Sequence, residues 1–349
     1  RHGNPSIRKL DTRPTLCVAL TCRTFAKLAL PLLFHLTEML TFALSPTSTT
    51  LSTAPKIMST LTSPVPTFLS SDARLYGYFV RFLSLGYLSP VSHFKQVLSC
   101  CPNVTHIVCT IVPGPLKWGP LLAQLHCLVA LRINAYDSLC ADDDSSALTF
   151  PTLEILFLLI QQDRAWGTIS WNLPKLRRLS LLCVRSPDLT RSVDFLQRYG
   201  KTLDYFYLEA GLGPLVLAEL ESLCPRLTHL QVIHPLLFEP NNPKPVHRGI
   251  TIIEFLDLRR EELEVSGGNA PIRRVLENLH LILFPCLKQI RCPWSLRTPP
   301  PDSPEFSENI AQPERLPTWF LELVAEWERN GIELIRTDID DLITLDSLN

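Results

Sequence analysis

The chain has 349 residues, and 46% of them are hydrophobic, which is enough to bury a large core. Lys and Arg number 33 against 34 Asp and Glu, without a basic run, so the composition argues against a nucleic-acid partner. The apolar stretch from Leu28 to Leu36 is too short to cross a bilayer, and no secretory signal is visible. We therefore expect a soluble protein with no membrane partner.

The 11 cysteines form no Cys-x-x-Cys pair. A free cysteine behaves as a small buried hydrophobe, and disulfides are rare in reducing compartments. The cysteine pattern therefore predicts a reduced, intracellular chain in the cytoplasm or nucleus, with no metal site and no cofactor.

Residues 1–44 carry a helical pattern, because their apolar residues recur at intervals of three and four. The first group is Leu16, Cys17 and Leu20, and the second is Phe25, Leu28, Ala29, Leu32, Leu33 and Leu36. Pro31 fits the start of a helix better than its interior. The sequence predicts helices from Thr15 to Leu44.

Two further segments precede the main body of the chain. Residues 45–71 are rich in Ser, Thr and Pro without a period, which predicts a connector. Residues 72–100 return to helical spacing, which predicts a helical N-terminal cap. Its apolar positions are Leu75, Phe79, Phe82, Leu83, Val91, Phe94, Val97 and Leu98.

From 101 to 294 one pattern recurs, apolar-x-x-apolar-x-apolar, often after a Pro. The eight triplets are Val104/Ile107/Cys109, Leu128/Leu131/Ile133, Leu153/Leu156/Leu158, Leu176/Leu179/Leu181, Leu203/Phe206/Leu208, Leu227/Leu230/Val232, Ile253/Leu256/Leu258 and Leu287/Ile290/Cys292. Their first members are separated by 24, 25, 23, 27, 24, 26 and 34 residues. A period of roughly 20–29 residues with this spacing is typical of leucine-rich repeats.

Such repeats place a short strand in each unit and stack the strands side by side, with helical or irregular returns. Helical spacing between triplets, at Ser192–Tyr199, Leu215–Leu223 and Pro271–Leu283, fits those returns. The predicted fold class is therefore α/β, a leucine-rich-repeat-like solenoid preceded by a small helical segment. Asp142-Asp143-Asp144 lies in a return and lacks the spaced ligands of a calcium loop.

The chain ends in two different segments. Residues 295–317 form a Pro-rich linker, and residues 318–349 predict a capping helix and a strand. The helix carries an apolar stripe of Trp319, Phe320, Leu323, Val324 and Trp327. Gly331 stands at its C-cap, and Ile332 with Leu334 begins the strand. The stripe can cover the last repeat, or its Trp pair can face a partner.

Residues between the inward apolar positions project from the opposite, concave face of the predicted strands. One column would be His106, Ala130, Ile155, Arg178, Tyr205, His229, Phe255 and Gln289, and the next Val108, Arg132, Phe157, Ser180, Tyr207, Gln231, Asp257 and Arg291. Aromatic and Arg side chains are enriched at binding hot spots. The target-binding candidates are Phe157, Arg178, Tyr205, Tyr207, His229, Gln231, Phe255 and Asp257. The alternative is that these side chains only cover neighbouring strands.

No catalytic motif is present, neither a G-x-S-x-G elbow nor a phosphate-binding loop nor a zinc-protease helix. We therefore identify no catalytic residue and expect a protein that is not an enzyme. An enzyme would require a deep pocket with converging titratable groups.

The run from Leu16 to Phe34, with Cys22-Arg23-Thr24-Phe25 at its centre, resembles the latter part of the F-box in fungal F-box proteins with degenerate leucine-rich repeats. The Leu-Pro opening of that pattern is absent here, as is most of its first helix. A second likeness to this group is Asp72-Ala73-Arg74-Leu75-Tyr76 with Tyr78.

The resemblance implies a substrate-recognition subunit of an SCF-type ubiquitin ligase. It would bind a Skp-type adaptor and the cullin complex through the N-terminal helices, and an unknown protein substrate through the repeat face. The implied adaptor-binding residues are Leu16, Leu20, Cys22, Arg23, Phe25, Leu28 and Leu32. The alternative is a leucine-rich-repeat scaffold without a ubiquitin-ligase role.

Overall fold

The computed structural model describes residues 78, 80–87, 91–111, 118–135, 148–160, 171–183, 189–208, 213–233, 235, 238, 246–256, 258, 263, 271–292 and 317–336. The chain divides into two compact units. Unit 1 comprises residues 1–153 with 168–174, and unit 2 comprises residues 154–167 with 175–349.

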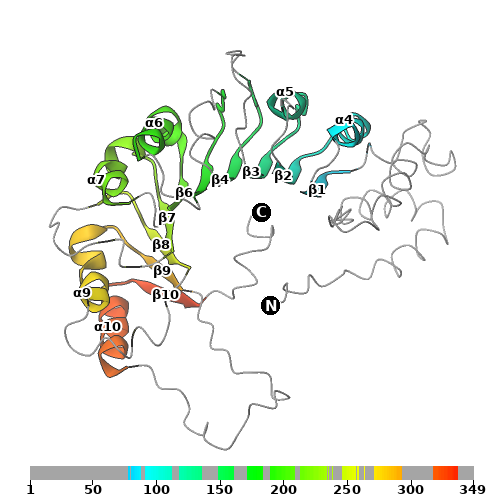
Figure 1. Cartoon of the computed structure of the whole chain (residues 1–349). Helices are drawn as coiled ribbons and strands as arrows, with labels where there is room; N and C mark the ends of the chain where they lie inside the picture. Colours follow the sequence, from blue (N-terminus) through cyan, green and yellow to red (C-terminus); the bar gives the residue numbers. More distant parts are fainter. Residues whose placement is uncertain are drawn as a thin grey trace, which may run out of the picture. The chain divides into compact units, whose positions relative to one another are not determined.

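The described part of unit 1 contains three parallel strands and two helices (Figure 1). In chain order these are β1 Phe82–Tyr87, α4 Val91–Cys100, β2 His106–Ile111, α5 Trp118–Ala123 and β3 Ala130–Ala135. Strand β2 pairs with both of the others. A bridge between Thr149 and Asn172 and a ring contact of 4.9 Å between Phe150 and Trp171 extend the same unit.

Among the residues of unit 2 that the structure describes, seven strands pair in chain order, all parallel. They are β4 Ile155–Ile160, β5 Arg178–Cys183, β6 Tyr205–Leu208, β7 His229–Val232, β8 Ile252–Phe255, β9 Gln289–Cys292 and β10 Glu333–Arg336. The returns include α6 Leu189–Tyr199, α7 Gly213–Leu223, α9 Pro271–Asn278, the π-helical turn η7 Leu279–Leu283 and α10 Thr318–Arg329. These helices lie on one side of the unit 2 strands in Figure 1.

A tight turn leads into most strands and explains the repeated Pro. The N–H of the first apolar residue donates to the carbonyl three residues earlier, as in Val104 to Cys101 (3.3 Å) and Leu227 to Cys224 (3.0 Å). Pro fits the second position of such a turn because its φ is already fixed near the required value. Both ends of the turn are buried, since Cys101, Val104, Cys224 and Leu227 are each 0% exposed.

A ladder of backbone hydrogen bonds joins neighbouring repeats just before each strand. In unit 2 the Asp204 carbonyl accepts the N–H groups of Thr228 (3.1 Å) and His229 (3.0 Å), and the Thr228 carbonyl accepts those of Thr251 and Ile252. Threonine hydroxyls add a third donor, as in Thr228 Oγ1 to the Asp204 carbonyl at 3.1 Å. The ladder fixes the register of each strand on the one before it.

The expected register of the seventh repeat is wrong by three residues. Strand β8 places Ile253 opposite Leu230 and Phe255 opposite Val232, so the inward triplet is Ile250, Ile253 and Phe255. All three are 0% exposed. Phe255 is therefore a core residue and not a target-binding candidate, and Asp257 lies outside the described residues.

His247 explains how this repeat begins without a Pro. Its Nδ1 accepts the Gly249 N–H at 2.9 Å, so Nε2 carries the proton and donates to the Cys224 carbonyl at 2.9 Å. The ring is 1% exposed, and it joins the preceding turn to the start of β8. The imidazole thus takes the place of the Pro turn.

The helical expectation for residues 72–100 holds for α4 but fails at Phe82–Tyr87, which form β1. Val80 and Leu83 are 4% and 0% exposed. In sequence, Val80, Leu83 and Leu85 have the same spacing as the triplets, and Val80 precedes Val104 by 24 residues. The first strand therefore begins one repeat earlier than expected.

The C-terminal segment adds a helix and a strand to unit 2. Phe320 and Trp327 of α10 are 0% and 1% exposed. Trp319 donates its Nε1–H to the Leu263 carbonyl at 3.3 Å and stacks under Arg273. The Trp pair therefore packs onto unit 2, and β10 extends the sheet by pairing with β9.

The α/β character and the parallel strands of the expected fold are confirmed. The F-box-like helices of residues 1–44 lie outside the described residues. Among the helices that are described, none combines the length and apolar character required to cross a membrane. The described cysteines are free thiols.

Candidate functional site on the open face of the sheet

The unit 2 strands present two rows of side chains on the face opposite the helices, which we call the open face. Strand pairing defines both rows, since every second residue of a strand points the same way. The first row is Ile155, Arg178, Tyr205, His229, Ile252 and Gln289, and the second is Phe157, Ser180, Tyr207, Gln231, Glu254 and Arg291.

Tyr205 of β6 connects the two rows at their centre. Its ring meets the His229 ring edge-on, with centroids 4.8 Å apart and an interplanar angle of 83°. Its hydroxyl donates to Gln231 Oε1 at 2.5 Å. Packing and hydrogen bonding together hold the three side chains in one arrangement.

A buried carboxylate lies beside this group. Glu254 is 4% exposed, and its Oε2 lies 3.1 Å from His229 Nε2. A buried carboxylate without a partner is costly, so removal of the imidazole would leave an uncompensated polar group. We call Tyr205, His229, Gln231 and Glu254 the polar cluster.

The surroundings of Tyr205 keep its hydroxyl protonated. Burial raises the pKa of the phenol well above its usual value, and the nearby charge of Glu254 raises it further. A side-chain hydrogen bond with Ser180 acts in the opposite direction. The hydroxyl therefore remains a hydrogen-bond donor at neutral pH.

The polar contacts continue beyond β8. Arg291 Nη2 donates to Gln289 Oε1 at 3.2 Å, and Gln289 Nε2 donates to Glu333 Oε2 at 3.2 Å. Arg291 stands opposite Glu254 in the pairing of β8 with β9. The two rows thus carry donors and acceptors in fixed positions from β6 to β10.

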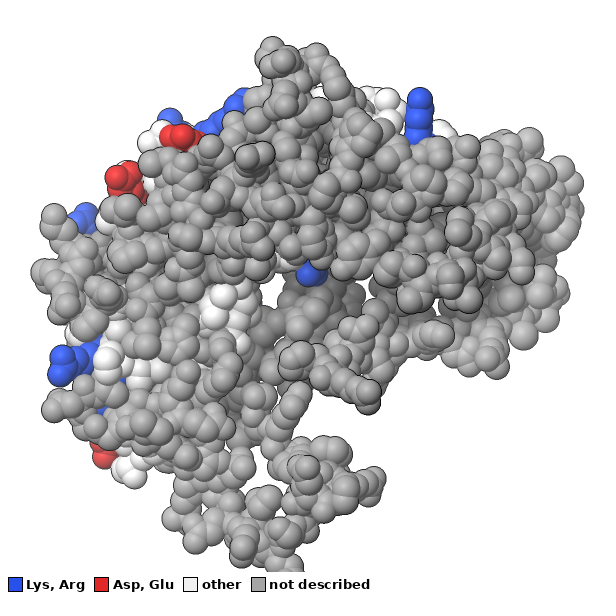
Figure 2. Space-filling view, in the orientation of Figure 1, with Lys and Arg blue, Asp and Glu red and all other residues white. Residues whose placement is uncertain are grey.

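The polar cluster combines aromatic rings with hydrogen-bonding groups. The polar cluster contains no Ser or Cys nucleophile next to its imidazole, so it lacks the nucleophile and base of an acyl-transfer site. The described residues contain no group of His, Cys, Asp and Glu that could hold a metal ion. In the view of Figure 2, basic and acidic side chains are interspersed along the outer margin.

The structure brings together six of the eight target-binding candidates, namely Phe157, Arg178, Tyr205, Tyr207, His229 and Gln231. Tyr207 and Gln231 are buried, at 5% and 8% exposure. Phe157 is half-buried on β4, one strand before Ser180. The seven adaptor-binding residues, Leu16 to Leu32, lie outside the described residues.

Sequence reasoning missed Ile252 and Glu254. Both follow from the correct register of β8, which the turn at Arg248-Gly249-Ile250 sets. That turn lacks the Pro that several other repeats have, and it has Gly249 directly before the first inward residue.

No protein-family profile matches the chain, and no curated protein shows significant similarity to it. Among solved structures, the crystal structure of a TLR13–ssRNA13 complex aligns with 13% sequence identity and a TM-score of 0.32. The alignment covers 61% of this chain and 35% of that one, so the chain spans about a third of its length. This TM-score is too low to support a fold assignment, which rests instead on the strand pairing described above.

Proposed function

We propose that this chain is a leucine-rich-repeat-like scaffold that binds a protein ligand on the open face of unit 2. The polar cluster is the observation that carries the proposal. Tyr205, His229 and Glu254 come from three consecutive strands, and they are held by a ring contact of 4.8 Å and a polar contact of 3.1 Å.

Such a cluster suits recognition because its groups are already ordered. Because these side chains are already held in place, forming a complex costs less conformational entropy than it would if binding had to order them. Tyr and Arg also offer large contact areas with a polar end. Arg178, Tyr205 and His229 in the first row are partly exposed and can touch a ligand directly.

The test is site-specific crosslinking in an extract of the source cells. A photoreactive phenylalanine analogue replaces Tyr205 in one sample and Leu321, an exposed residue of α10 on the helical side, in the control. We expect one protein to crosslink at position 205 only. The purified partner should then bind the wild type and lose at least about tenfold in affinity on R178A, in line with a hot-spot residue.

Two outcomes would refute the proposal. The same proteins could crosslink at both positions, which would indicate chance encounters. Alternatively, the purified partner could bind R178A and Y205F as tightly as the wild type while circular dichroism shows that both variants are folded.

The more specific proposal is that the scaffold is a substrate receptor of an SCF-type ubiquitin ligase. It is supported by the F-box-like run around Cys22-Arg23-Thr24-Phe25. To test this proposal, the chain is mixed with a Skp-type adaptor and the mass of the complex is measured by size exclusion. A variant that carries L20D, F25D and L32D is the comparison. Binding by the wild type and not by the variant is expected. If the wild type forms no complex with the adaptor, the scaffold lacks this role.

A further inference from the structure

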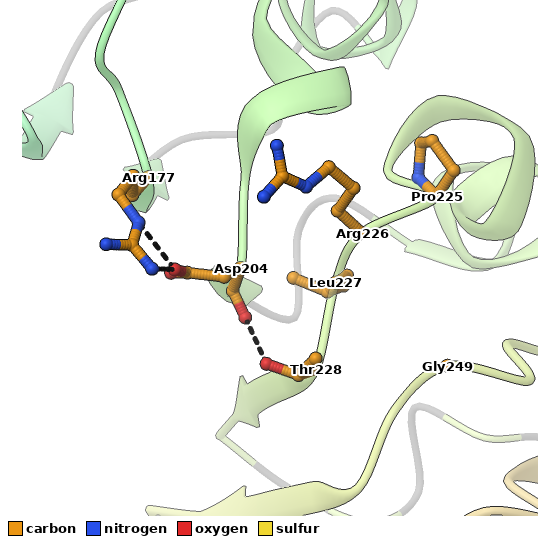
Figure 3. A pocket seen from close by; sticks show the side chains of 7 residues that line it. All are labelled: Arg177, Asp204, Pro225, Arg226, Leu227, Thr228 and Gly249. Carbon is orange, nitrogen blue, oxygen red and sulfur yellow. Dashed lines mark hydrogen bonds and ion pairs between the residues drawn. The ribbon is translucent and has the colours of Figure 1, made fainter.

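A pocket lies at the edge of the unit 2 sheet, where the chain enters strands β5 to β8. It has a volume of about 510 Å³ and is lined by Arg177, Asp204, Pro225, Arg226, Leu227, Thr228 and Gly249 (Figure 3). The pocket is separate from the open face, because its lining residues all precede the strands.

Basic side chains follow this edge from repeat to repeat. Six of them stand one to four residues before a strand, all exposed, and we call them the basic ridge. They are Lys175, Arg177, Lys201, Arg226, Arg248 and Lys288. Neighbouring strands are about 4.8 Å apart, so the ridge offers a cation at nearly every step across the sheet edge.

Most of the ridge charge is uncompensated. Within the described part of the chain, Asp204 pairs with Arg177, whose Nε and Nη2 lie 2.8 and 2.5 Å from Asp204 Oδ2. No ion pair within the described residues involves the Arg226 guanidinium, which points into the same pocket (Figure 3). The ridge therefore attracts an anion, and Arg226 is its free donor inside the pocket.

The lining favours one class of anion. A single-stranded nucleic acid usually stacks its bases on aromatic rings, and the seven lining residues include none. The Asp204 carboxylate also repels phosphate but accepts the N–H of a peptide. A peptide with acidic side chains supplies both the carboxylate for Arg226 and the donor for Asp204.

We propose that the basic ridge binds an extended acidic segment of a partner protein, with one acidic side chain of that segment in the pocket beside Arg226. Five strands span roughly 20 Å, which an extended peptide of six or more residues covers. This surface is distinct from the open face, so its test can fail while the proposed function stands.

The experiment measures fluorescence anisotropy with a labelled peptide of about ten residues in which Glu alternates with Gly. A peptide with Gln in place of Glu is the ligand control. We expect the acidic peptide to bind more weakly as salt rises, because exposed charges are screened. R226E and R248E should each weaken binding at least about tenfold, since each removes a charged hydrogen bond and adds repulsion.

The matched control is R274E, which makes the same charge change at an exposed position of α9 away from the ridge. It should leave binding within about twofold of wild type. R226Q replaces R226E if the latter fails to fold by circular dichroism. Equal binding of the Gln peptide, or equal weakening by R274E, would overturn the proposal. So would tighter binding of a single-stranded oligonucleotide that R226E abolishes, because the ridge would then be a nucleic-acid site.

Discussion

Among the free cysteines of the described residues, four are buried and two are exposed. Burial raises the pKa of Cys101, Cys109 and Cys224 to about 12, so these thiols stay protonated at neutral pH. Cys127 and Cys286 are exposed. Because the thiolate is the reactive form, buried thiols should be inert in the folded chain.

We predict that iodoacetamide at neutral pH modifies Cys127 and Cys286 in the native protein and spares Cys101, Cys109 and Cys224. Mass spectrometry of tryptic peptides gives the extent of modification at each site. In urea all five should react at similar rates. Rapid modification of Cys109 in the folded chain would contradict the buried position of β2.

His280 makes the free energy of unfolding depend on pH. Burial lowers the pKa of His280 below its ordinary value of 6.5, and the charge of Glu326 opposes this in part. The unfolded chain therefore binds the proton more tightly than the folded chain does. The stability from neutral His280 is complete above pH 6.5 and is lost as the pH falls toward the folded pKa.

We predict that the free energy of unfolding falls between pH 6.5 and 5 and that H280Q flattens this dependence. Urea unfolding at several pH values measures it. E326Q serves as the comparison, because loss of its charge lowers the pKa of His280 further and should keep or steepen the slope. An unchanged slope in H280Q would assign the pH dependence to other groups.

Two glycines at the ends of helices are required for different reasons. Gly331 follows α10 with φ of +75°. The Ile332 N–H donates to the Trp327 carbonyl and the Gly331 N–H to the Glu328 carbonyl, which is the Schellman arrangement. Gly200 instead permits a close approach, since a Cβ there would lie 2.4 Å from the Leu223 carbonyl oxygen.

We predict that G331A costs about 1 kcal/mol, which is the backbone cost of the left-handed conformation, since an added Cβ meets no atom within 4 Å. G200A should cost more, about 2–3 kcal/mol, because α6 and α7 must separate. Urea denaturation gives both values. G331N is the control and should lose less than G331A, since Asn tolerates this conformation. The reverse order of G200A and G331A would disprove this account.

The sequence predicts the repeating elements well because the same turn leads into most strands and the same apolar spacing accompanies it. Helix α9 lies within its predicted return, and α6 and α7 end where predicted but begin three and two residues earlier, at Leu189 and Gly213. The register of β8 is not predicted, because Ile253 fits both the first and the second position of the triplet. Only the turn held by His247 decides between them, and that depends on a contact with Cys224, 23 residues away.

The candidate site was predicted in part for the same reason. His229 and Gln231 follow from a triplet whose register the turn at Pro225 fixes, and Tyr205 follows from a triplet whose turn begins at Gly200. The partner of His229 could not be predicted, since Glu254 enters the second row only in the observed register. The pocket was also missed, because its residues come from turns that the repeat pattern treats as spacers.

Across unit 2 the strands depend on one another through the ladder and through the shared core. Strand β10 completes the described sheet by pairing with β9, and Trp327 of α10 is 1% exposed. Without α10, the apolar surface of unit 2 that Phe320 and Trp327 cover would be exposed to water. Large exposed apolar patches favour association with other chains, and terminal repeats need a cap for solubility.

We predict that a chain ending at Leu316 self-associates, seen as a higher mass by light scattering after size exclusion. In the full chain W327A should lose about 3–5 kcal/mol in urea unfolding, because the cavity left by a large buried ring is only partly refilled. L321A on the same helix is the control, since Leu321 is 48% exposed and its removal should cost under about 0.5 kcal/mol. A monomeric truncated chain with the stability of the full chain would show that α10 and β10 are dispensable. The cap of unit 2 would then have to lie elsewhere.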